Sequence, residues 1–169
     1  MLGRQCVQGF TLIELIVTLI IIVILTLVAI PLFTSLIQEH RVIGQAENLY
    51  YSLQYARSEA VKRNATIYVS FSTGSSWCYG LNVGSACNCT IANNCGLETV
   101  SAPAAQETSL STSGLTNNAI SFEGTHGAAS STGSITFTVY GGTSLITISI
   151  GTMGGLQMCS TGIGGYQAC

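Results

Sequence analysis

Charged residues are scarce in this chain and unevenly placed. Only 7% of the 169 residues are charged, aspartate is absent, and the formal net charge is −2. No lysine or arginine follows Arg63. The sequence beyond that residue therefore lacks the basic patch that gives non-specific affinity for nucleic acids. Without a strong field to steer charged partners, the surface must rely on serine, threonine, asparagine, glutamine and glycine.

Side chains for acid–base catalysis or metal binding are equally few. The two histidines are His40, in an amphipathic stretch, and His126, in a predicted turn. With no aspartate and few glutamates, no acid–base pair is suggested by spacing. The segment CNCTIANNC, residues 87–95, has no nearby histidine, and exported cysteines oxidise more often than they bind zinc. We predict no enzymatic activity, no cofactor and no bound metal.

A single long apolar run dominates the N-terminal part of the chain. Residues 10–30, FTLIELIVTLIIIVILTLVAI, contain one charged side chain, that of Glu14. At about 1.5 Å per residue, a helix of this length spans roughly 31 Å, the thickness of the hydrocarbon core of a bilayer. A secretory signal has a shorter apolar core and a small-residue cleavage site, and LTLVAIPLF offers no clear site. We predict a membrane helix over residues 10–30, in which Glu14 requires a partner.

The segment before the run, residues 1–9, is a short leader whose one charge is Arg4. A basic residue next to a membrane span favours a cytoplasmic N-terminus, which places the rest of the chain outside the cytoplasm. Cysteine usage fits this orientation, because disulfides persist in oxidising compartments. One of the seven cysteines, Cys6, lies in the leader, and six follow the span. These six candidates for disulfide bonds are Cys78, Cys87, Cys89, Cys95, Cys159 and Cys169.

The sequence only partly defines how these cysteines pair, since six cysteines allow 15 pairings. A bond between Cys87 and Cys89 is disfavoured, because one intervening residue makes a strained ring. We expect Cys159 to pair with Cys169, and the other four to pair within the loop of residues 78–95. A redox or metal-binding protein would instead need free thiols.

The segment after the apolar run has the pattern of an amphipathic helix. Apolar residues recur at spacings of three, four or seven, with polar residues largely between them. The apolar set is Leu36, Ile43, Ala46, Tyr50, Leu53 and Ala60. We predict that the helix continues over residues 31–64, with a kink or a loosened turn at Pro31 and its end at Asn64.

The pattern then changes to the alternation of half-buried strands, beginning with ATIYVSFS, residues 65–72. Further strands are predicted at AISFEG, SITFTVYG and SLITISIG, with a hairpin turn at YGGTS. Residues 74–116 have little periodicity and are predicted to form a long disulfide-tied loop with one strand near WCYGLNV. The predicted fold class is α+β: a long N-terminal helix, transmembrane and then amphipathic, packed on an antiparallel β-sheet head of residues 65–169.

The stretch GFTLIE, followed by the apolar run, resembles the class III signal of type IV pilins and type II secretion pseudopilins. Gly9 stands before the cleavage position, Phe10 after it, Glu14 at the fifth mature position and Pro31 at the twenty-second. The resemblance implies that prepilin peptidase cleaves between Gly9 and Phe10 and that Phe10 is N-methylated. It also implies that Glu14 meets the amine of a neighbouring subunit in a filament, so that the two charges neutralise each other. An ordinary membrane anchor, with Glu14 reaching the headgroups, leaves this spacing unexplained.

A second stretch, LQYARSEAVKRNATIYVSF, resembles the helix-to-strand junction of the GspH/FimT family of minor pseudopilins and minor pilins. SSWCYGLNV, ISFEGTHG and ITISIGTMGGLQMCS follow in the order of that family, the last as a final strand that runs into a Gly-led loop. Two interpretations remain open for Arg57, Glu59, Lys62 and Arg63 in the ARSEA region. They form a solvated helix face, with Glu59 and Arg63 as an i,i+4 pair, or they contact another filament subunit.

Minor pilins of this family that take up DNA carry a G-R-x-R motif on the last loop. Its two arginines are suited to binding the phosphates of DNA. The corresponding residues here are Gly154, Gly155, Leu156, Gln157 and Met158. The arginines are absent in either alignment of this loop. A DNA-binding minor pilin for natural transformation is therefore the disfavoured alternative.

The resemblance as a whole implies a minor subunit of a type IV pilus or a type II secretion pseudopilus, and the choice between the two machines stays open. Such a subunit begins as a single-pass protein of the bacterial inner membrane with a periplasmic head and then enters the filament, helping to initiate its assembly. Its expected partners are other pilin or pseudopilin subunits, prepilin peptidase and the inner-membrane assembly platform, and nucleic acid is not among them.

Overall fold

The computed structural model describes residues 9–103, 108–139 and 142–169, except for the side chains of residues 28–32 and 34–35. The chain forms two compact units, Met1–Ile37 and Gln38–Cys169. One helix, α1 (Leu12–Arg63), contributes to both units. The strands are β1 (Ile67–Ser72), β2 (Cys78–Val83), β3 (Glu98–Ser101), β4 (Thr108–Ser113), β5 (Ala119–Phe122), β6 (Gly133–Val139), β7 (Leu145–Ile150), β8 (Leu156–Thr161) and β9 (Gln167–Ala168).

The first unit contains the N-terminal part of α1. Among the residues that the structure describes, no helical segment combines the length and hydropathy of a membrane span. The membrane helix predicted over residues 10–30 is therefore not confirmed. The predicted kink at Pro31 concerns a side chain outside the described residues, and the leader residues 1–8, with Arg4 and Cys6, also lie outside them.

In the second unit, α1 buries one face in the core. Its fully buried residues recur at spacings of four and three, which places them on one side of the helix. They are Val42, Ala46, Leu49, Leu53, Ala56 and Ala60. The predicted apolar set overlaps with this face at Ala46, Leu53 and Ala60, while Leu36 is 54% exposed.

The helix ends at Arg63 in a Schellman motif, next to Asn64, where the sequence predicts its end. Asn64 has a φ of +49°, the left-handed conformation that asparagine tolerates better than most residues. The amide of Asn64 donates to the carbonyl of Val61 at 3.2 Å, and the amide of Ala65 donates to the carbonyl of Ala60 at 3.1 Å. This turn leads the chain directly into β1.

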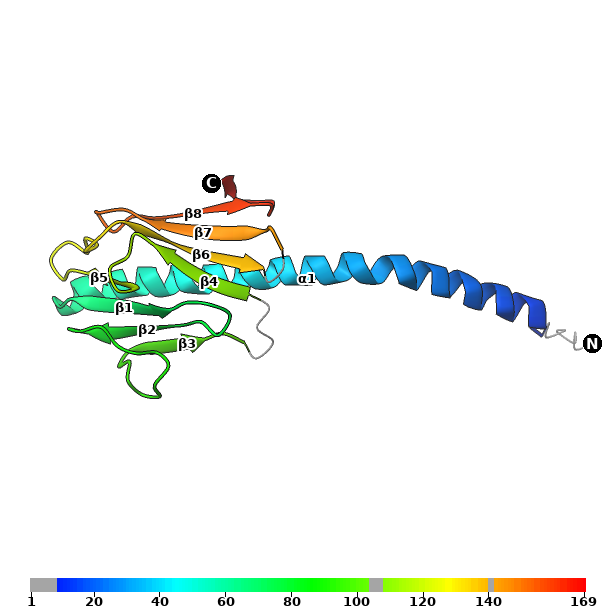
Figure 1. Ribbon diagram of the computed structural model, residues 1–169, viewed down its shortest axis with the longest axis horizontal. Helices are drawn as coiled ribbons and strands as arrows, with labels where there is room; N and C mark the ends of the chain where they lie inside the picture. Colours follow the sequence, from blue (N-terminus) through cyan, green and yellow to red (C-terminus); the bar gives the residue numbers. More distant parts are fainter. Residues whose placement is uncertain (1–8, 104–107, 140–141) are drawn as a thin grey trace, which may run out of the picture. The chain divides into compact units, whose positions relative to one another are not determined.

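Two sheets enclose the core together with α1 (Figure 1). The four-stranded sheet has the order β3-β2-β1-β5, and the five-stranded sheet has the order β4-β6-β7-β8-β9. All neighbouring strands are antiparallel except β8 and β9, which are parallel. Alternate apolar residues of the central strands point inward, such as Ile67, Val69 and Phe71 of β1. The α+β pilin-like class is thus confirmed, with two sheets in the head.

Four strands, β3, β4, β8 and the two-residue β9, were not predicted from the sequence. The long loop predicted for residues 74–116 contains β3 and β4 in addition to β2, and the Gly-led loop after β7 leads into β8. The sequences ETVS, TSLSTS and LQMCST carry few apolar residues, so the period of two is weak, and pairing with neighbouring strands defines them. The predicted hairpin turn YGGTS includes residues 140–141, which lie outside the described residues.

Candidate functional site

The first candidate site is the N-terminal motif, where Gly9 and Phe10 precede the helix. Phe10 is 81% exposed, and neither residue belongs to α1. The hydroxyl oxygen of Thr11 accepts a hydrogen bond from the amide of Glu14 at 3.3 Å. Thr11 is therefore the N-cap of α1 and Glu14 its N3 residue, the spacing of a capping box. This local role of Glu14 was missed, although the T-x-x-E spacing could have indicated it.

The hydrogen bond to Thr11 uses the backbone amide of Glu14, so it leaves the carboxylate available for another partner. A negative charge in the first turn complements the helix dipole. Among the described residues, the carboxylate oxygens of Glu14 have no hydrogen-bond or ion-pair partner. The bond between Gly9 and Phe10 lies outside the helix, so a peptidase can reach it without unwinding α1. Cleavage there would create an amine on Phe10, directly before the cap.

The second candidate site is the ARSEA region at the end of α1, where Arg57 joins the helix to two loops. Its Nε atom donates to the carbonyl of Gly127 at 3.1 Å, and its Nη2 atom donates to the carbonyl of Met153 at 3.2 Å. Gly127 lies between β5 and β6, and Met153 lies between β7 and β8. We call Arg57, Gly127 and Met153 the arginine clasp. Arg57 is thus bound within its own chain rather than part of a freely solvated face, and its contact with another filament subunit stays a prediction.

Two glycines make the close approach at the arginine clasp possible. Gly127 and Gly154 have φ angles of +66° and +71°, a region that glycine adopts without steric cost. A β-carbon at Gly127 would lie 2.9 Å from Cγ of Arg57, and one at Gly154 would overlap the carbonyl of Gly127. The Gly-led loop that the sequence predicts therefore lies where the backbone meets Arg57.

Glu59 differs from its prediction as part of a solvated face, because its side chain is only 6% exposed. Nε of Arg63 donates to its carboxylate at 2.5 Å, which confirms the predicted i,i+4 pair, and Nζ of Lys62 lies 3.6 Å away. The hydrogen bond from Arg63 lowers the pKa of Glu59; burial opposes this shift, and the charge of Lys62 adds to it. The basic residues at the end of α1 thus neutralise a buried carboxylate and also complement the helix dipole.

Buried and part-buried polar contacts connect α1 to β4 and to the loop before β9, and none was predicted. The indole of Trp77 donates to Thr108 Oγ1 at 3.2 Å, and that hydroxyl donates to Gln45 Oε1 at 2.5 Å. The hydroxyl of Tyr166 donates to Glu47 at 2.8 Å; burial and this contact raise the pKa of Tyr166 to about 12. These pairs are distant in sequence, so no local pattern could have indicated them.

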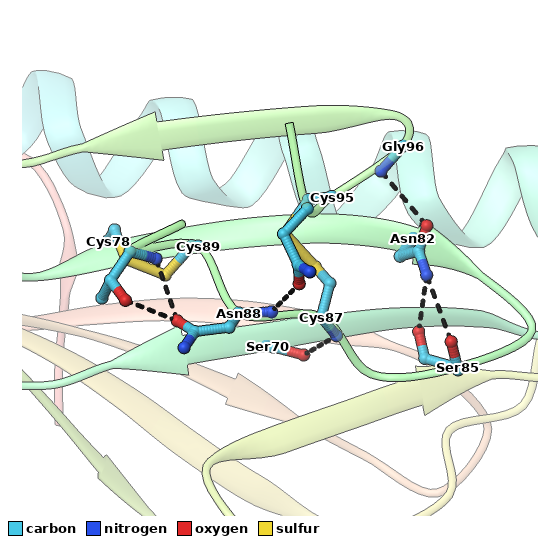
Figure 2. The surroundings of a disulfide bond; sticks show 11 residues. Ser70, Cys78, Asn82, Ser85, Cys87, Asn88, Cys89, Cys95 and Gly96 are labelled. Atoms are coloured by element: carbon cyan, nitrogen blue, oxygen red, sulfur yellow. Dashed lines mark hydrogen bonds between the residues drawn. A yellow bond between two sulfur atoms is a disulfide. The ribbon is translucent and has the colours of Figure 1, made fainter. Parts of the chain in front are cut away.

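The six cysteines of the head form three disulfides. Cys159 pairs with Cys169, and the other four pair within residues 78–95, in agreement with the sequence prediction. Figure 2 shows the two bonds of this loop, Cys78–Cys89 and Cys87–Cys95. The amide of Cys87 also donates to the hydroxyl of Ser70 on β1 at 3.2 Å, so the loop is fastened to the sheet.

The two histidines and the last loop contribute little chemistry. His40 is exposed, and His126 lies in the predicted turn, where its Nδ1 atom is 3.4 Å from Glu123. Among the described residues of the loop 151–155 and of β8 there is no cationic side chain, and the nearby guanidinium of Arg57 is bound to two carbonyls. The positions that correspond to the G-R-x-R motif therefore hold no residue that could bind a phosphate by charge.

Comparison with known proteins identifies two families in the chain. The family described as type II transport protein GspH matches residues 45–154, which contain the arginine clasp and strands β1 to β7. The prokaryotic N-terminal methylation motif matches residues 4–30, which contain Gly9, Phe10 and Glu14. A search of curated proteins and a search of solved structures gave no match. Since the first match covers more than half of its length, the chain belongs to the GspH family of type II transport proteins, and it carries the N-terminal methylation motif ahead of the GspH region.

Proposed function

We propose that the chain is a minor subunit of a type IV pilus or a type II secretion pseudopilus, enters the filament through its N-terminal helix and helps to initiate filament assembly. The observation that carries this proposal is the presence of an N-methylation motif and a GspH head on one chain. The work of such a subunit is assembly and contact rather than catalysis.

The first step is maturation in the bacterial inner membrane. In this proposal residues 1–9 are the leader, residues 10–30 cross the membrane once, and the head lies in the periplasm. Prepilin peptidase cleaves between Gly9 and Phe10, and Phe10 is then N-methylated. The position of both residues ahead of α1 supports this step, because the scissile bond is not part of a helix.

The second step is incorporation into the filament by the inner-membrane assembly platform, with other pilin or pseudopilin subunits as partners. Every large apolar side chain described between Leu12 and Leu27 is at least 43% exposed in the single chain. A helix that is apolar all round is stable only when other apolar groups cover it. Lipid covers it before assembly, and the helices of neighbouring subunits cover it afterwards.

Glu14 gives this packing its register. Its carboxylate has no partner among the described residues of its own chain, and a buried unpaired charge is costly. The N-terminal amine of Phe10 in a neighbouring mature subunit supplies the opposite charge. Pairing of the two groups favours the filament over the isolated subunit and fixes the axial offset between helices.

Mass spectrometry and an assembly assay together test the proposal. The membrane-extracted protein should begin with methylated Phe10. The variant Glu14→Gln keeps a side chain that suits the N3 position of a capping box but removes the charge, so it should be cleaved normally and be lost from purified filaments. Its matched control, Glu39→Gln, makes the same change at a half-buried glutamate of α1 outside the apolar run and should assemble normally.

Two results would contradict the proposal. One is a native chain that still begins at Met1 or is cut near Ala29, which would leave an ordinary anchor or signal. The other is unchanged piliation and unchanged secretion after deletion of the gene. DNA binding is not included, because the head lacks the arginines of the uptake proteins; a gel shift with this chain should show no complex.

A further inference from the structure

A groove of about 680 Å³ lies over the outer face of the four-stranded sheet. Its floor includes Tyr68, Ser70 and Ser72, which alternate along β1 with the inward-facing core residues. One wall is the disulfide loop at residues 86–89, and the other is formed by residues 116–118 and 130–131. The volume falls within the range of about 300–1,000 Å³ that is usual for small-molecule sites.

The lining of the groove is polar but uncharged. Among the described residues that form it there is no aspartate, glutamate, lysine, arginine or histidine. The polar groups are instead hydroxyls and primary amides, which both donate and accept hydrogen bonds. A phosphate, a nucleic acid or a metal ion would find no opposite charge here. Only a neutral ligand matches this chemistry without burying an unpaired charge.

Several of these groups have hydrogen-bonding capacity that the chain itself does not use. Within the described residues, the side-chain amide of Asn117 has no partner. Asn88 and Asn118 use their oxygens, with Thr90 and Thr112 as donors, and their NH₂ groups have no partner in the part of the chain that the structure describes. Ser131 Oγ is buried without a partner among the described residues, so a water or a ligand hydroxyl can bind it.

The groove is also held in shape before any ligand arrives. The bonds Cys78–Cys89 and Cys87–Cys95 brace one wall, and the amide of Cys87 anchors it to the floor at Ser70 (Figure 2). On the other wall, the carbonyl of Asn118 accepts a hydrogen bond from the amide of Phe71 on β1 at 2.8 Å. Rigid walls lower the entropy cost of binding, so a modest number of hydrogen bonds can give useful affinity.

We propose that this groove binds a neutral carbohydrate, in the form of a short oligosaccharide. Each sugar hydroxyl is both a donor and an acceptor and thus matches the amides and hydroxyls of the lining. The half-buried ring of Tyr68 offers an apolar surface to the C–H groups of a pyranose. A peptide strand fits less well, because β1 is paired on both sides and the edge strand β5 already exchanges hydrogen bonds with Ser130 at Ser121. The proposal concerns the head alone and does not depend on filament assembly.

The test is saturation-transfer NMR and calorimetry on the full chain, in a detergent without a sugar headgroup. The probes are maltotetraose, cellotetraose, chitotetraose and the acidic tetragalacturonate. We expect at least one neutral probe to bind and tetragalacturonate not to bind. Asn117→Gly, which keeps the left-handed backbone and removes the amide, and Tyr68→Leu should each weaken binding at least tenfold. The control Tyr55→Leu, on the helix, should bind as the native chain does.

Fluorescence of the single tryptophan, Trp77, checks that each variant is folded, since this side chain is 2% exposed. If Tyr68→Leu fails to fold, Asn117→Gly and Asn118→Gly decide the question. The proposal is overturned if no neutral probe binds, if the acidic probe binds more tightly, or if the groove variants bind as well as the native chain.

Discussion

The arginine clasp gives the most direct prediction, because the Arg57 side chain joins α1 by hydrogen bonds to the loops of Gly127 and Met153. Replacement of Arg57 by alanine removes two hydrogen bonds from a charged donor to backbone carbonyls. Such bonds contribute about 1.5–3 kcal/mol each when buried. Arg57 is only half-buried, so we expect a loss of about 2 kcal/mol for both together.

The loss should appear as a lower Tm of the second unit. For a domain of this size, 1 kcal/mol corresponds to about 4 °C, so Arg57→Ala should lower the Tm by about 8 °C. Trp77 fluorescence reports this transition. Arg57→Lys should recover less than half of the loss, because an ammonium group cannot reproduce the planar fork that reaches both carbonyls. Hydrogen exchange of the Gly127 and Gly154 amides should become faster in both variants.

The matched control is Lys62→Ala, on the same helix. Its side chain is 76% exposed and lies 3.6 Å from Glu59, so the change should cost no more than about 0.5 kcal/mol. The reasoning fails if Arg57→Ala and Lys62→Ala have the same Tm, or if exchange at the two loops is unchanged in Arg57→Ala.

Two further predictions concern Glu59 and Gly80. The pKa of Glu59 is lowered below 4.5 in the folded chain, so its stabilising contribution is present above about pH 4.5 and is lost as the pH falls through the lowered value. In urea titrations from pH 6 to 3, Glu59→Gln should therefore flatten the dependence of unfolding free energy on pH. An unchanged pH dependence in this variant would contradict the assignment. A β-carbon at Gly80 would overlap Cys95 Sγ, so mass spectrometry after alkylation should detect free thiols in Gly80→Ala. The control is Gly155→Ala, where space is open, and this variant should keep three disulfides. Equal numbers of free thiols in the two variants would refute the reasoning.

The parts of the fold that the sequence predicted are those with a strong local signal. The end of α1 at Asn64 follows from an asparagine that tolerates the left-handed conformation. The strands β1, β6 and β7 alternate apolar and polar residues over their length, so the period of two is plain. The pairing Cys159–Cys169 follows from the distance of these two residues from the other four in sequence.

The parts that the sequence did not predict depend on contacts between distant residues. The strand β4, TSLSTS, has a single large apolar residue, Leu110, and exists because it pairs with β6. Arg57 and its carbonyl partners are separated by 70 and 96 positions, so a helical-wheel pattern shows only a charged residue on a polar face. Glu59 can be buried because Lys62 and Arg63 neutralise its charge. The general rule that charged residues lie on the surface does not predict this.

The scarcity of charge and the arrangement of the head have a common consequence. The chain has five basic residues in all, and three of them, Arg57, Lys62 and Arg63, make contacts within the head. A surface with so few cations cannot attract partners over long distances. It must recognise them by shape and by neutral hydrogen bonds at short range, and such recognition requires rigid surfaces. The disulfides and the arginine clasp supply that rigidity, because they fix the loops that would otherwise lose the most entropy on binding.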